Sequence, residues 1–121
     1  MQTILLIEDE SAIQHALTDK LKEEGFDVLE AKNGEDGLKM AKEKHPDLIL
    51  LDIIMPIMDG ITMFKELRKD EWGKDAKIIF LTNLSEEERI SEVLNLGTAE
   101  YLIKTDWSLA DVVKKIREKL K

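Results

Sequence analysis

Acidic residues in this sequence follow two apolar runs. Glu8, Asp9 and Glu10 come directly after "TILLI", and Asp52 closes "LILLD". A carboxylate set against so much hydrocarbon is costly unless a nearby group compensates its charge. Carboxylate oxygens and water suit Mg²⁺, whereas the His and Cys ligands usual for zinc are absent from these positions. We therefore expect Glu8, Asp9 and Asp52 to surround a hard divalent cation.

Two further polar residues follow later apolar runs. Thr82 closes "AKIIFLT", and Lys104 comes directly after "AEYLI". Ligands of open α/β sheets gather outside the carboxyl ends of the strands, so this hydroxyl and this ammonium should converge with the acids. Lys104 would then stand beside Asp52, where it could pair with the carboxylate or with an anionic group placed on it.

Short apolar runs alternate with amphipathic segments along the chain. Strands are expected over residues 3–7, 27–31, 47–51, 76–82 and 99–103, and the first, third and fourth are apolar enough to be buried on both faces. Helices are expected over 11–24 and 33–45, from 59 onward, and after serine-first capping boxes at 85 and 108. The predicted architecture is α/β, a doubly wound sandwich of five strand-helix units with helices on both faces of a parallel sheet.

Composition limits the possible classes of protein. The 121 residues suit one domain, expected over 1–121, and the net charge of −8 disfavours direct binding to nucleic acid or anionic lipid. The sequence has no cysteine, which excludes a disulfide framework and fits a reducing compartment. Acids interrupt the N-terminal segment before any signal core forms, and no run is long enough for membrane insertion. Cytoplasmic residence is therefore expected.

Four motifs, in this order, resemble the receiver domain of bacterial two-component response regulators. They are "LLIEDE", "LLDIIMPIMDG", "IIFLT" and "AEYLIK", and the resemblance extends over essentially the whole chain. In length, the chain resembles a single-domain receiver of the chemotaxis-regulator type. The resemblance implies a five-stranded parallel sheet in the order 2-1-3-4-5. It also implies a phosphoacceptor that dephosphorylates itself slowly and turns over no external substrate.

The resemblance assigns roles to the acidic residues. It implies that Asp52 is the phosphorylated residue and that Asp9 is a direct Mg²⁺ ligand. Glu8 would act largely through metal-bound water, and the backbone carbonyl of Ile54 would be a third protein ligand. Asp52 then ends an apolar strand because the strand fixes its carboxylate beside the metal, ready to attack a phosphorus atom.

The resemblance also implies a switch and a set of partners. Thr82 and Lys104 would bind phosphoryl oxygens, and Tyr101 would turn inward when Thr82 moves. The implied partners are a sensor histidine kinase or histidine phosphotransfer protein and a downstream protein effector. The chain would be a monomer or a phosphorylation-dependent homodimer.

Two departures from the family pattern lead to further expectations. Thr105 stands where receivers usually have proline, so the Lys104–Thr105 bond is expected to be trans, with Trp107 as a fluorescent reporter of the loop. The resemblance also implies that Ile54 and Leu84 flank the path by which water reaches the phosphoryl group. Because neither apolar side chain can orient a water molecule, hydrolysis of the acyl phosphate is expected to be slow.

Plainer interpretations exist for each residue. Acids favour a helix N-terminus for electrostatic reasons alone, Asp59 is expected to cap a helix, and a lone His15 on a polar helix face is usually solvated. A flavodoxin-like nucleotide binder would need amide and hydroxyl donors where this chain has acids. A phosphatase of the haloacid dehalogenase type would need an acid in place of Ile54. A degenerate receiver that binds proteins without phosphorylation remains the open alternative.

Overall fold

The computed structural model describes residues 2–82, 100–103 and 108–121. The predicted fourth helix and the Lys104–Thr105 bond lie outside these residues. The strands are β1 Thr3–Ile7, β2 Asp27–Ala31, β3 Leu48–Asp52, β4 Ile78–Thr82 and β5 Glu100–Ile103. The helices are α1 Ser11–Glu23, α2 Gly34–Lys44, α3 Gly60–Arg68 and α5 Leu109–Leu120, with a short 3₁₀ helix at Gly73–Asp75.

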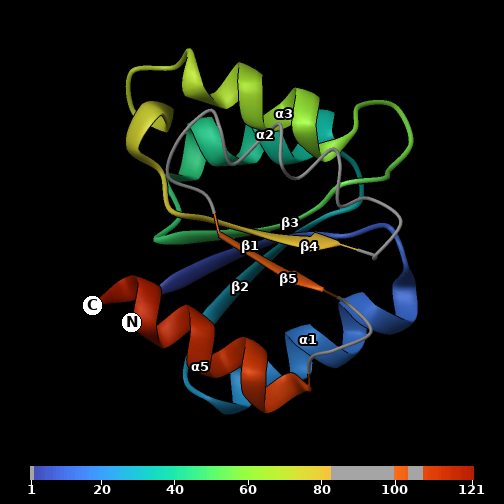
Figure 1. The fold of residues 1–121 in the computed structure, drawn as a ribbon, viewed down its shortest axis with the longest axis vertical. Coiled ribbons are helices and arrows are strands. Elements are labelled where there is room, and N and C mark those ends of the chain that lie inside the picture. The colour runs from blue at the N-terminus through green and yellow to red at the C-terminus, as the bar shows by residue number, and fades with distance from the viewer. Residues whose placement is uncertain (1, 83–99, 104–107) are drawn as a thin grey trace.

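The strands form one parallel sheet in the order β2-β1-β3-β4-β5. Helices α2 and α3 cover one face of the sheet, and α1 and α5 cover the other (Figure 1). This arrangement confirms the predicted doubly wound α/β class. The bounds of β3 and β4 differ from the prediction. β3 spans Leu48–Asp52 and so lies one residue later than predicted, and β4 begins only at Ile78, because Ala76 still forms the C-cap of the preceding 3₁₀ helix.

The strands β1 and β3 send alternate side chains into two separate apolar clusters. Leu5 and Ile49 face α2 and α3, whereas Leu6 and Leu50 face α1 and α5. All four side chains are fully buried, and burial of each such side chain contributes roughly 1.5–3 kcal/mol. A shift of register by one residue would exchange the two sets of side chains. The carboxyl ends of the strands are therefore held in fixed alignment.

Side-chain caps fix where three helices begin. The Asn33 side chain accepts a hydrogen bond from the Asp36 N–H at 2.8 Å, and Asp59 accepts one from the Thr62 N–H at 2.8 Å. At α5, Ser108 and Asp111 form the predicted reciprocal capping box. The expected role of Asp59 as a helix cap is thus confirmed. Among the described residues, no helix has the length and apolar character needed to cross a membrane.

Candidate functional site

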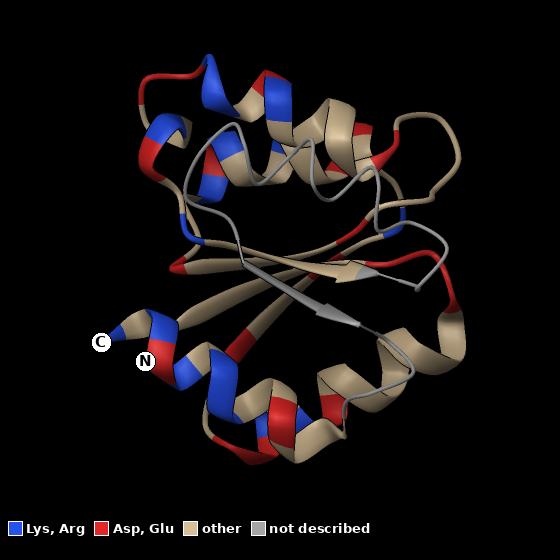
Figure 2. Ribbon diagram, in the orientation of Figure 1, with Lys and Arg blue, Asp and Glu red and all other residues tan. Residues whose placement is uncertain are grey.

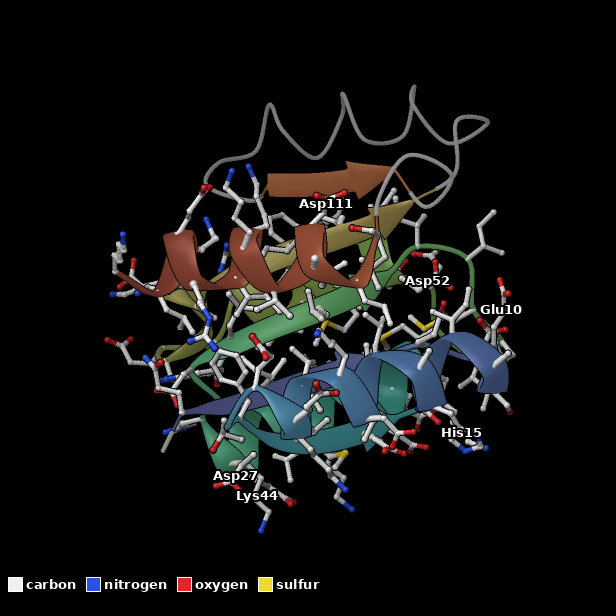
Figure 3. The ribbon with its side chains drawn as sticks, turned by 90° about the horizontal axis from the view of Figure 1, so that it is seen from below. Glu10, His15, Asp27, Lys44, Asp52 and Asp111 are labelled. Carbon is white, nitrogen blue, oxygen red and sulfur yellow. The ribbon has the colours of Figure 1, made fainter. Side chains whose placement is uncertain are left out.

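Three carboxylates meet at the carboxyl edge of the sheet. Glu8, Asp9 and Asp52 each place a carboxylate oxygen so that these atoms all lie within 4.8 Å of one another. Glu8 and Asp52 are buried, with 0% and 3% of their surfaces exposed, and Asp9 is exposed. Figure 2 shows the acidic ribbon of the loop between β1 and α1, and Figure 3 shows Asp52 and Glu10 at the same end of the molecule. The structure therefore brings together the three acids expected from the sequence.

Strand register explains this meeting of residues that are distant in sequence. Ile7 pairs with Leu51, so the residues that follow them, Glu8 and Asp52, lie side by side at the carboxyl edge of the sheet. The Glu8 N–H donates a hydrogen bond to the carbonyl oxygen of Ala31 at 3.0 Å, which extends the pairing of β1 with β2 by one residue. The Asp52 Oδ1 atom accepts a hydrogen bond from the Ile53 N–H at 2.9 Å. Both buried acids are thus oriented by backbone contacts.

The helix α3 begins very close to the end of β3. A Cβ atom on Gly60 would lie 2.1 Å from the carbonyl oxygen of Asp52, so no larger residue fits without a shift of the backbone. The Gly60 N–H donates a hydrogen bond to the carbonyl of Ile53 at 2.7 Å. Glycine at this position allows α3 to pack directly against the strand that carries Asp52.

The loop between β3 and α3 exposes apolar side chains beside the acids. Ile54 is 57% exposed and Ile57 is 75% exposed. The backbone of Ile57 has φ +69°, and the Met58 N–H donates to the Pro56 carbonyl at 2.7 Å, which makes a tight three-residue turn. Met55 is buried in the core. The predicted metal contact through the Ile54 carbonyl stays a prediction.

The backbone also places two other predicted residues at or near this edge. Thr82 is the last residue of β4 and follows Leu81, which pairs with Asp52 of β3. Tyr101 lies in β5 and pairs with Phe80 of β4. The roles proposed for Thr82 and Tyr101 stay predictions. Other residues with predicted roles lie outside the described part of the chain, namely Leu84, Lys104, Thr105 and Trp107.

The donor set fits Mg²⁺. All three groups in the acidic cluster are carboxylates, which are the hard oxygen ligands that this ion prefers. Like charges this close repel one another, and a divalent cation would relieve the repulsion. Glu8, Asp9 and Asp52 are the described residues that would hold it.

One polar residue at this end of the molecule was not singled out from the sequence. Gln14 lies on α1 with only 2% of its surface exposed. The signal for it was weak, since a polar residue beside Ile13 and Leu17 on an amphipathic helix reads equally well as part of the solvated face. The tertiary structure reveals its burial.

An acidic cluster at the carboxyl edge of a parallel sheet in the order 2-1-3-4-5 is the arrangement that the resemblance to receiver domains implies. The chain belongs to the response regulator receiver domain family, whose family model matches residues 4–117. Receiver domains of this family are non-enzymatic signalling domains of two-component systems, and they imply a histidine kinase as partner.

Some relatives are much longer than this chain, and others are similar to it in length. The chain is 40% identical over 103 residues to a probable transcriptional regulator ycf27 of Porphyridium aerugineum, covering 85% of this chain but only 42% of that protein. It is 36% identical over 101 residues to the chemotaxis protein CheY of Halobacterium salinarum, covering 84% and 82% of the two chains. The chain thus spans half or less of the length of the first of these relatives.

A solved structure provides a direct comparison for the acidic site. The receiver domain of the sensor histidine kinase PA1611 from Pseudomonas aeruginosa superposes with a TM-score of 0.89 at 28% identity, covering 98% of this chain and 97% of that chain. That crystal structure has a magnesium ion coordinated in its active site cleft. The acidic cluster described above resembles a receiver magnesium site.

Proposed function

We propose that this chain accepts a phosphoryl group on Asp52 from a histidine kinase or histidine phosphotransfer protein. Mg²⁺ would be held by the carboxylates of Glu8, Asp9 and Asp52 and by the Ile54 carbonyl. The observation that carries the proposal is the meeting of three carboxylate oxygens within 4.8 Å, two of them from buried residues. Burial of two like charges side by side is unfavourable for stability, which supports a role in binding and chemistry.

The reaction is a transfer between two nucleophiles. A carboxylate oxygen of Asp52 attacks phosphorus as the bond from phosphorus to the donor's imidazole nitrogen breaks, and the electron pair leaves with that nitrogen. Bound Mg²⁺ supplies positive charge to the phosphoryl oxygens. Thr82 and Lys104 would bind the remaining oxygens. Because β3 is buried along its whole length, Asp52 needs little reorganisation before the attack.

The product is a mixed anhydride, which can drive a conformational change before water destroys it. Thr82 would move toward the phosphoryl group and Tyr101 would turn inward, which changes the surface offered to a downstream protein effector. We place this activity in the cytoplasm, in a single receiver domain over residues 1–121. The chain would act as a monomer or as a phosphorylation-dependent homodimer.

Intact-mass measurement tests the assignment of Asp52. After incubation with MgCl₂ and acetyl phosphate, the wild-type chain should gain one phosphoryl group, and Asp52→Asn should gain none. Asp59→Asn is the matched control, because Asp59 is a nearby acid that caps α3 and asparagine caps helices equally well. This control should gain the phosphoryl group.

Two outcomes would contradict the proposal. An adduct that persists in Asp52→Asn would mean that another residue is the acceptor. No adduct at any Mg²⁺ concentration would favour the degenerate receiver, which binds its partners without phosphorylation.

A further inference from the structure

Gln14 is a buried polar residue that the proposed phosphoryl transfer does not use. It lies in the first turns of α1, directly after the acidic loop, and only 2% of its surface is exposed. An amide group buried to this extent is costly unless it makes hydrogen bonds. The bonds that it makes therefore indicate why the residue is there.

The hydrogen bonds that Gln14 donates connect the acidic loop to α1 and to the end of β2. Its side-chain Nε2 donates to the Glu8 carbonyl at 3.2 Å and to the Ala31 carbonyl at 3.3 Å. Its backbone N–H donates to the Glu10 carbonyl at 2.9 Å. The carbonyls on both sides of Asp9 are therefore held by one residue.

The Ala31 carbonyl completes this arrangement. It accepts the Glu8 N–H as well as the Gln14 amide, so the N–H and the C=O of Glu8 are both tied to the end of β2. The two peptide groups that flank the α-carbon of Glu8 cannot rotate without breaking at least one of these bonds. The backbone that carries the Glu8 carboxylate and leads into Asp9 is thus held in place at the acidic cluster.

We propose that Gln14 is a positioning residue for the metal site, which sets Mg²⁺ affinity by holding the loop of Glu8 and Asp9 in its binding conformation. The inference rests on the proposed function, since it requires these acids to bind Mg²⁺. Residues that orient metal ligands without touching the metal typically contribute 10–100-fold to affinity, and we expect roughly the lower of these values because Gln14 acts through the backbone. A purely structural Gln14 would change stability and leave Mg²⁺ affinity unchanged.

The variant that tests this is Gln14→Met. Methionine keeps the length and approximate volume of glutamine and removes both amide donors. Alanine is a poorer choice, because Gln14 borders a groove of about 470 Å³ between β2 and α2, from which water could enter and replace the lost donors. Gln14→Leu is the second variant, since leucine also lacks the amide donors and adds no charge near the acidic cluster.

Thr18→Val provides the matched control. Thr18 lies on α1 with 5% of its surface exposed, and within the described part of the chain its Oγ1 atom has no hydrogen-bond partner. This substitution also replaces a buried polar group on the same helix by an apolar one of similar shape. It removes no contact with the acidic loop.

The measurement is an MgCl₂ titration of the metal-free chain, followed by amide chemical shifts in ¹H–¹⁵N NMR, at a temperature where thermal melts show every variant folded. The Kd for Mg²⁺ should rise roughly tenfold in Gln14→Met and Gln14→Leu and stay within about twofold of wild type in Thr18→Val. An unchanged Kd in both Gln14 variants, or an equal rise in Thr18→Val, would overturn the inference and leave the proposed function intact. Absence of saturable Mg²⁺ binding in the wild type would overturn both.

Discussion

The repulsion among the buried acids can be measured by neutralising one of them. Asp52→Asn keeps the shape of the side chain and the Oδ1 acceptor for the Ile53 N–H, but removes one charge. Two charges 4.8 Å apart repel by roughly 3.5 kcal/mol at an effective dielectric constant of about 20. The repulsion between Asp52 and Glu8 is the largest in the cluster, because both side chains are buried. The repulsion between Asp52 and the exposed Asp9 is smaller, because solvent screens it.

The expected net gain is smaller than this Coulomb energy. Neighbouring groups and solvent already relieve part of the repulsion, so without metal we expect Asp52→Asn to be more stable than wild type by about 1–2 kcal/mol. For a chain of this length each kcal/mol raises the melting temperature by roughly 4 °C. Thermal unfolding in EDTA, followed by circular dichroism, measures the difference.

Added MgCl₂ should reduce this advantage. Ligand binding to the folded state stabilises the wild type as the Mg²⁺ concentration rises above its Kd, and the variant gains less because one carboxylate ligand is lost. Asp59→Asn should melt close to wild type and keep the full gain from Mg²⁺. The reasoning is refuted if Asp52→Asn melts below wild type in EDTA, or if both proteins gain equally from Mg²⁺.

Three further predictions concern the lifetime of the phosphorylated state, the loop beside the site and the last helix. The double variant of Ile54→Asn and Leu84→Glu should lose its phosphoryl group roughly tenfold faster than wild type, which corresponds to a barrier lowered by about 1.4 kcal/mol. The first-order decay is followed in Mg²⁺ without kinase. An unchanged or slower decay would exclude shielding by these side chains. Ile57→Gly should raise the free energy of unfolding, measured by urea denaturation, by roughly 0.5–1 kcal/mol, because the backbone of Ile57 has φ +69° and its side chain is 75% exposed. A lower free energy of unfolding would show that packing of Ile57 outweighs its backbone strain. The backbone N–H of Ser108 lowers the pKa of Asp111, so the ionised carboxyl stabilises the folded chain above the ordinary Asp pKa, and this contribution is lost as the pH falls through the lowered value. The advantage of wild type over Asp111→Asn in urea midpoint should therefore shrink between about pH 7 and about pH 3, and a constant difference would contradict it.

The sequence alone determined the elements of this fold and the residue types at its functional edge. The apolar runs of β1 and β3 are readable because a strand buried on both faces needs apolar side chains at every position. Helix starts at Asn33, Asp59 and Ser108 are readable because a cap bonds to the backbone only a few residues away. These signals are local, so they hold before the chain has folded.

The positions of the acids relative to one another depended on the tertiary structure. Glu8 meets Asp52 because β1 pairs with β3 in one register, and that register is set by side chains from both faces of the sheet. The Gln14 amide reaches the Ala31 carbonyl only after α1 has packed beside β2. No local pattern identifies such a pair, because the free energy that brings its members together comes from burial of the surrounding apolar side chains and not from the two residues themselves.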